Sequence, residues 1–189
     1  MYLLLVLFSA FSIQVQAEPI QSLFEKLRDS GEDYQNEGAV CEQVARLELQ
    51  REYPSHSYEI VVGIEYANVR QTIGELDVVV FDRHGQAILV GEVKCWSDLR
   101  KARRKAAQQR TRFLDTIQSG APIDMFLASN RSVPFRREQF QALSRFISIS
   151  QRGGRSFGFD RDLPNSLSEM RELRETLMQC QAAGKCRRP

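Results

Sequence analysis

The fold is decided by residues 72–96, which read TIGELDVVVFDRHGQAILVGEVKCW. Two apolar runs rich in valine and isoleucine flank Arg83-His84-Gly85-Gln86, a polar, glycine-containing segment typical of a hairpin turn. Branched residues of this kind favour strands. The stretch therefore predicts two adjacent strands, over residues 72–82 and 87–96.

Charged residues interrupt both runs. Glu92 and Lys94 are two positions apart, so they share one face of a strand, and the hairpin brings Asp77 beside them. Glu75, on the same strand face as Asp77, is a further candidate acid. A Glu-x-Lys pair is usually a solvated strand edge, but the apolar neighbours here indicate an interior position. Such charges are costly to bury unless they pair or bind a cation. The set is typical of metal-assisted hydrolysis, in which carboxylates hold a hard divalent ion that activates water.

Outward from this hairpin, apolar periodicity predicts the remaining elements. The predicted strands are 58–69 and 123–128, and the predicted helices are 20–28, 37–52, 98–118, 137–146 and 166–179, with a loop at Gly153-Gly154. Asp98 is the expected cap of the helix that follows the hairpin. The order predicts one α/β domain with a mixed central β-sheet flanked by helices.

The two charged motifs, Gly74-Glu-Leu-Asp77 and Gly91-Glu-Val-Lys94, resemble the active-site core of the PD-(D/E)XK (restriction-endonuclease-like) nuclease superfamily. They are most similar to the branch with archaeal Holliday-junction resolvases and related small bacterial proteins. Upstream, Gly38-Ala-Val-Cys-Glu42-Gln-Val-Ala45 matches that branch's G-x-x-x-E-x-x-A, and Gln109-Arg-Thr-Arg-Phe113 fits its Q-x-x-x-Y with Phe for Tyr. Leu76 replaces the proline of the P-D element. The resemblance covers residues 38 to 113.

The resemblance implies a role for each matched residue. Asp77 and Glu92 would be metal ligands, and Glu42 would bind the metal directly or through water. Lys94 would position the water or stabilise charge at the phosphate, and Gln109 would orient the lysine or the substrate backbone. The expected ion is Mg²⁺ or Mn²⁺.

The helix after Lys94 is cationic over thirteen residues, and no acid interrupts its basic residues, which are Arg100, Lys101, Arg103, Arg104, Lys105, Arg110 and Arg112. The alternative is a solvated helix face, but such faces usually mix signs. A single-sign helix beside a metal site favours phosphate contact and a nucleic-acid partner, DNA rather than RNA. Backbone contacts of this kind carry no base preference. The sequence leaves open whether the protein forms a homodimer.

The first 17 residues carry no charged side chain, and Ala17 precedes the polar start at Glu18. The apolar stretch is too short to span a bilayer, so it predicts a signal peptide cut near Ala17-Glu18. The protein would then be secreted or periplasmic, with no stable membrane association after cleavage. The start lacks a basic residue, so an uncleaved anchor or a buried first helix is the alternative.

Four cysteines follow the predicted cut, and their spacing does not match a zinc site. Cys180 and Cys186 are close together in a polar tail and are the expected disulfide. Cys41 and Cys95 have apolar neighbours and are predicted as buried thiols, with a bridge between them as the alternative.

The 189-residue chain is expected to divide into a signal peptide (1–17), an N-terminal helix and linker (18–34), a nuclease-like core (35–130) and a C-terminal helical extension with a basic tail (131–189). The formal net charge of +2 does not by itself indicate nucleic-acid binding. The expected function is that of an exported, metal-dependent endonuclease that hydrolyses DNA. The alternatives are an inactive nucleic-acid-binding or interaction protein on the same fold, and an intracellular resolvase-like repair protein.

Overall fold

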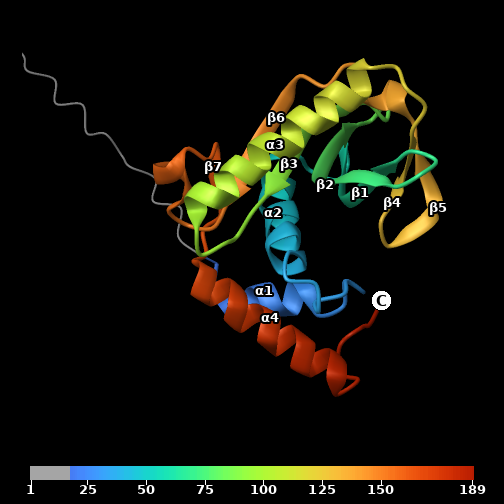
Figure 1. The fold of residues 1–189 in the computed structure, drawn as a ribbon. Coiled ribbons are helices and arrows are strands. Elements are labelled where there is room, and N and C mark those ends of the chain that lie inside the picture. The colour runs from blue at the N-terminus through green and yellow to red at the C-terminus, as the bar shows by residue number, and fades with distance from the viewer. Residues whose placement is uncertain (1–17) are drawn as a thin grey trace, which may run out of the picture.

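A computed structural model describes residues 18–189 and shows one α/β domain with a mixed seven-stranded sheet (Figure 1). The strand order is β5-β4-β1-β2-β3-β6-β7. The strands are β1 (Tyr58–Ala67), β2 (Thr72–Asp82), β3 (Ala87–Val93), β4 (Asp124–Leu127), β5 (Asn130–Phe135), β6 (Arg145–Ser150) and β7 (Arg161–Asp162). From β5 through β3 neighbouring strands are antiparallel, whereas β6 runs parallel to both β3 and β7. The predicted fold class is confirmed.

Helices cover both faces of the sheet (Figure 1). They are α1 (Ile20–Leu27), α2 (Ala39–Glu52), α3 (Leu99–Gln118) and α4 (Leu167–Ala182), with short 3₁₀ helices η1 (Arg137–Phe140) and η2 (Gly154–Phe157). Buried residues of α1, α2 and α4 pack on one face, and Phe113 of α3 packs on the other. Asp98 caps α3 as predicted, since its side chain accepts a hydrogen bond from the Lys101 amide at 2.9 Å.

The helix predicted over residues 137–146 is wrong. Only η1 is helical there, and Arg145 begins β6, which hydrogen-bonds beside β3 in the interior of the sheet. Two serines make this strand look polar, yet both are buried and satisfied. Ser148 donates to Asp160 and Ser150 donates to the Lys94 carbonyl, each at 2.7 Å. Buried hydroxyls with partners are compatible with a core strand.

The C-terminal third is therefore more than a helical extension. Residues 131–189 contribute most of β5 and all of β6 and β7 to the same sheet, so no structural boundary falls at residue 130. The strands predicted over 58–69 and 87–96 end earlier, at Ala67 and Val93.

Strand β2 changes the face that it presents at Asp77. Val78 and Val80 pack in the hydrophobic cluster beneath α2, whereas Leu76 packs in the cluster beneath α3. On a regular strand, Leu76 and Val78 would share one face because they are two residues apart. Val62 pairs with Val78 and Ile64 with Leu76, so the partner of Asp77 is Gly63, whose φ of +73° favours glycine. This irregularity lets Asp77 face the space between the two helices.

Both cysteine pairs form disulfides. The Cys180–Cys186 bridge is confirmed and closes a short loop at the end of α4. Cys41 and Cys95 are also bridged, with Cα atoms 6.4 Å apart, so the prediction of buried thiols is wrong and its alternative holds. The predicted signal peptide lies outside the described residues. Within residues 18–189, no helix has the length and apolar character needed to cross a membrane.

Candidate carboxylate site

A cavity of about 300 Å³ lies where α2 and α3 approach the middle of β2 and the end of β3. Four of the five predicted catalytic residues line it: Glu42 from α2, Asp77 from β2, Lys94 after β3 and Gln109 from α3. Glu75 also lines it. The fifth, Glu92, lies behind Lys94 and is fully buried. The fold thus gathers residues that the sequence separates by up to 67 positions.

Lys94 is held against the carboxylates. Its Nζ donates to Asp77 Oδ2 at 2.5 Å, to Glu92 Oε2 at 3.4 Å and to the Val93 carbonyl at 3.1 Å. Asp77 Oδ2 also accepts the Val93 amide at 2.7 Å, which fixes that carboxylate between β2 and β3. Burial alone would lower the pKa of Lys94, but the charges of Asp77 and Glu92 outweigh it and raise the pKa.

Glu92 is the acid of the site with one oxygen left unsatisfied: Lys94 reaches its Oε2, but not its Oε1. Its Oε1 is buried and has no hydrogen-bond partner among the described residues. Burial, together with the neighbouring charge of Asp77, raises the pKa of Glu92 to about 9. A buried carboxyl oxygen without a partner is unfavourable in a folded protein.

Glu42 enters the cavity from α2. The carboxylate folds back over Gly38, where a Cβ atom would lie only 2.6 Å from Glu42 Oε1. Burial and the charges of Asp77 and Glu75 raise the pKa of Glu42 to about 8. The pKa of Glu75 is raised in the same direction by burial and by Asp77. Neither glutamate forms an ion pair within residues 18–189.

Four acidic side chains therefore lie around one buried cation, which pairs with only two of them, Asp77 and Glu92. The raised pKa values of Glu42, Glu75 and Glu92 show that their ionised forms lack compensation, and a hard divalent ion would supply it. Carboxylate oxygens are the ligands that Mg²⁺ and Mn²⁺ prefer, and Glu92 Oε1 is an oxygen that still needs a partner. In the part of the chain that the structure describes, no three acidic, histidine or cysteine side chains already converge as metal ligands. One oxygen of Asp77, Oδ2, is instead hydrogen-bonded to the Lys94 ammonium.

Gln109 and Lys105 reach the same cavity from α3. Gln109 does not contact Lys94; its Oε1 is buried without a hydrogen-bond partner among the described residues. The predicted role of orienting the lysine is therefore not seen in this arrangement, and the amide is free to receive a donor from a ligand.

The seven cations of α3 form no ion pair within residues 18–189. Two of them bond main-chain carbonyls instead: Arg103 donates to Gly158 and Arg112 donates to Ile73. Arg110 lies over the ring of Phe146. The other four make no such contact, so most of the positive charge along this helix is available to a partner.

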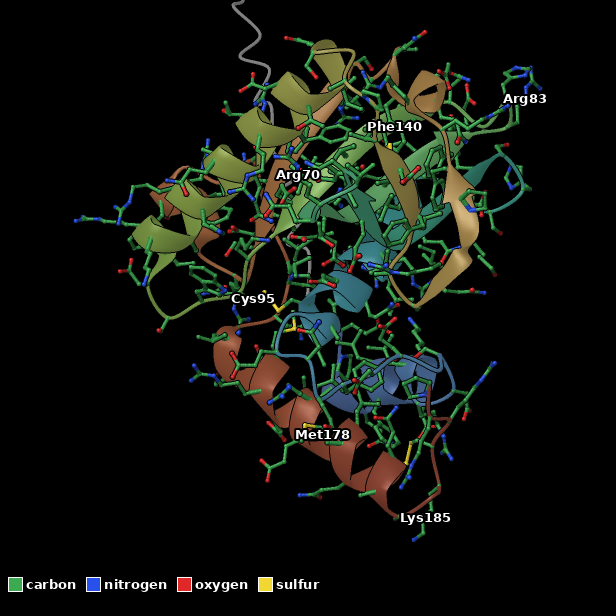
Figure 2. All side chains as sticks on the ribbon, turned by 45° about the vertical axis from the view of Figure 1, so that its right-hand side comes forward. Arg70, Arg83, Cys95, Phe140, Met178 and Lys185 are labelled. Atoms are coloured by element: carbon green, nitrogen blue, oxygen red, sulfur yellow. A yellow bond between two sulfur atoms is a disulfide. The ribbon has the colours of Figure 1, made fainter. Side chains whose placement is uncertain are left out.

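Two features of the site were not anticipated from the sequence. Trp96 is 37% exposed and lines the cavity. The Cys41–Cys95 bridge joins the residue before Glu42 to the residue after Lys94, and so ties together two segments that form the site (Figure 2). The only feature of the sequence that could have indicated this disulfide is the apolar surroundings of both cysteines. Such surroundings are equally compatible with buried free thiols.

The chain was compared with protein-family models, with curated proteins and with solved structures, and none of them matches it.

Proposed function

We propose that the protein is a metal-dependent nuclease that hydrolyses phosphodiester bonds in DNA. The observation that carries this proposal is the buried, undercompensated carboxylate cluster that meets Lys94 in a cavity beside a helix of unpaired cations. Strongly perturbed carboxyl groups in a cleft are typical of functional sites. The neighbouring cations of α3 complement a polyanion.

Each residue of the site would have a role that follows from its position. Asp77, Glu92 and Glu42 would hold the divalent ion, which when bound supplies activation of a water molecule and screening of phosphate charge. Lys94 carries a full positive charge and donates hydrogen bonds, so it would stabilise the charge that builds on the phosphate oxygens as water attacks in line.

Two further residues would hold the substrate. Lys105 would draw a phosphate of the strand towards the cavity, and the Gln109 amide would accept or donate to the sugar–phosphate backbone. The α3 cations would position the rest of the strand through its phosphates.

Membership of the PD-(D/E)XK superfamily is part of the proposal. It is supported by the order and placement of the motifs: Glu42 on the helix before the sheet, Asp77 and Glu92 on adjacent strands, and Gln109 on the following helix. Export is also proposed. The two disulfides support it, because such bonds persist in oxidising compartments.

A binding protein without catalysis is the second candidate. Two features of the site favour it. Lys94 already neutralises Asp77. In addition, the carboxylates of Glu42, Asp77 and Glu92 do not converge on one point within the described residues. Such a protein would need no divalent ion.

Digestion of plasmid and single-stranded DNA separates the two candidates. Protein beginning at Glu18 should cleave DNA in Mg²⁺ or Mn²⁺ and lose that activity in EDTA. Asp77→Asn is the matched control, because it keeps the size of the side chain and removes its charge. Cleavage that persists in this variant would contradict the assignment of the carboxylate site as the nuclease centre. Metal-independent DNA binding with no cleavage by the wild type would favour the binding protein.

Binding should depend on salt through α3. Arg100 and Arg104 are exposed and make no hydrogen bond within the described residues, so their joint replacement by Ala should weaken DNA binding without disturbing the fold. The slope of log affinity against log salt should fall by about one to two units, since each phosphate contact releases counterions. An unchanged slope would remove α3 from the DNA interface.

A further inference from the structure

Trp96 differs from the other exposed apolar side chains. The large hydrophobic residues exposed in the described part of the chain are Val69, Trp96, Val133 and Phe157. Val69 belongs to the loop between β1 and β2, Val133 to β5 and Phe157 to η2. Of these four, only Trp96 lines the carboxylate cavity. Single exposed apolar residues are common on surfaces, so its place beside Lys94 and the carboxylates is what distinguishes it.

The backbone that carries this indole is fixed on both sides. The Trp96 carbonyl accepts a hydrogen bond of 2.8 Å from the buried side chain of Gln151. The preceding residue, Cys95, is bridged to α2, and the Lys94 amide donates to the Ile149 carbonyl at 3.0 Å. Asp98 caps α3 two residues later. The backbone at Trp96 is thus fixed before any ligand binds, so only the side-chain rotation of the indole remains to be ordered on binding, which lowers the entropy cost of using it.

The surroundings of the ring decide what can cover it. The cavity is lined by carboxylates, by Lys94 and Lys105 and by the Gln109 amide, so its surface is more polar than apolar and suits a charged ligand better than a hydrophobic peptide. A nucleic-acid strand presents phosphates to the cations and a flat aromatic base to the indole. Stacking of a base on an aromatic side chain is favourable for every base, because each has a π-face.

We propose that Trp96 is a stacking platform for one unpaired base of the strand whose phosphate enters the carboxylate cavity. This inference rests on the proposed function for its polyanionic ligand. Bases inside a continuous duplex are covered on both faces by their neighbours, so stacking on Trp96 requires a base that has left the helix. The substrate class is therefore single-stranded DNA, or duplex DNA opened at an end, gap or loop.

The chain contains one tryptophan, so its tryptophan emission, excited selectively at a wavelength where tyrosine does not absorb, reports Trp96 alone. The purified protein is titrated in EDTA, which prevents cleavage, with oligothymidylate and with an abasic oligomer of equal length and charge. Oligothymidylate should quench the emission to saturation. The abasic oligomer, whose binding is followed by the anisotropy of an attached dye, should bind but leave the emission unchanged. Equal quenching by both oligomers would overturn the proposal.

Substitution gives a second, independent measurement. Trp96→Ala should weaken oligothymidylate binding by about 5- to 150-fold, the range that corresponds to one stacked base, and leave abasic binding unchanged. Trp96→Phe should recover part of the affinity. Thermal unfolding of each variant checks that the fold is kept. Wild-type affinity in Trp96→Ala would overturn the proposal.

Cleavage rates then test the substrate class. The wild type should cut a single strand or a gapped duplex faster than a continuous duplex, and Trp96→Ala should lose that preference. Faster cutting of the continuous duplex would overturn the proposal while leaving the nuclease function intact. The converse result, base-dependent quenching without any cleavage, would refute the nuclease function and support stacking on Trp96.

Discussion

Two of the charged clefts in the described part of the domain differ in how their acidic side chains are compensated. The larger, of about 620 Å³, lies beside β6 and β7 and contains four carboxylates, each with a partner. Glu48 pairs with Arg51 and Glu52 with Arg161, while Asp160 and Asp162 accept hydrogen bonds from the 148–155 segment. The smaller cavity of about 300 Å³ holds Lys94 and a surplus of buried acid. Size is therefore a poor guide here. Uncompensated buried acid distinguishes the smaller cleft, and this is why the proposed function is placed there.

The pKa values show the same contrast. At Asp160, hydrogen bonds from Ser148 outweigh the effect of partial burial and lower the pKa of the carboxyl. In the smaller cavity burial wins, and it raises the pKa of Glu42 and Glu92. Ionisation of Asp160 therefore stabilises the first cleft, whereas ionisation of Glu42 and Glu92 destabilises the second.

The largest expected effect separates activity from stability in the smaller cavity. Asp77→Asn and Glu92→Gln should each reduce metal-dependent cleavage to background, because the ion would lose a charged ligand. At pH 8 Glu92→Gln should keep or raise the melting temperature, by about 2–4 °C for each kcal/mol of repulsion relieved. Cleavage and calorimetry on the same preparations test both parts. An active Glu92→Gln enzyme would contradict the assignment.

A smaller loss of activity is expected when the bridge beside the cavity is removed. Replacing Cys41 and Cys95 together by Ala frees the segments that carry Glu42 and Lys94, and should lower the cleavage rate by about 10-fold or more, as misplaced catalytic groups do. Replacing Cys180 and Cys186 is the matched control, since that bridge lies at the end of α4, away from the cavity. Equal rates for the two double variants would show that the first bridge has no positioning role.

The pH dependence of stability should differ between the two clefts. The raised pKa of Glu92 means that its stabilising contribution is full below the unfolded value of 4.5 and is lost as the pH rises towards about 9. The lowered pKa of Asp160 has the opposite sign: its contribution is present above 3.8 and is lost as the pH falls. Melting temperatures between pH 5 and 9 should therefore fall less steeply in Glu92→Gln than in the wild type. Parallel curves would contradict this assignment.

The smallest effect belongs to the larger cleft. Arg161→Ala removes a partly exposed ion pair with Glu52, and such pairs contribute about 0–1 kcal/mol. Cleavage and DNA affinity should stay at wild-type values in assays run beside Asp77→Asn. A clear loss of either cleavage or DNA affinity would mean that the larger cleft also binds substrate, and that the two clefts do not differ in function.

The hairpin and the acids on it could be predicted from the sequence because both depend on local patterns. Residues 72–96 combine branched apolar runs with a polar turn, and the spacing of Glu92 and Lys94 fixes their common face. Glu42 and Gln109 could be placed only through the resemblance, since nothing in their own segments shows that α2 and α3 meet at the strand ends.

The misses arise from interactions between distant segments. Strand β6 looks polar because Ser148 and Ser150 find partners far away in the sequence, at Asp160 and at Lys94. The bridge between Cys41 and Cys95 spans 54 residues, and no local pattern distinguishes such a pair from two buried thiols. The exposure of Trp96 likewise depends on the path of the chain between the end of β3 and the start of α3, which no local pattern fixes.

The Cys41–Cys95 bridge also makes the covalent assembly of the cavity depend on the redox state of the compartment. In a reducing compartment these residues remain thiols, and the segments bearing Glu42 and Lys94 are joined by packing alone. An oxidant completes the covalent frame of the cavity. For a nuclease this would act as maturation without proteolysis: the enzyme would be least well assembled in the compartment that holds its maker's own DNA, and become fully formed only after leaving it.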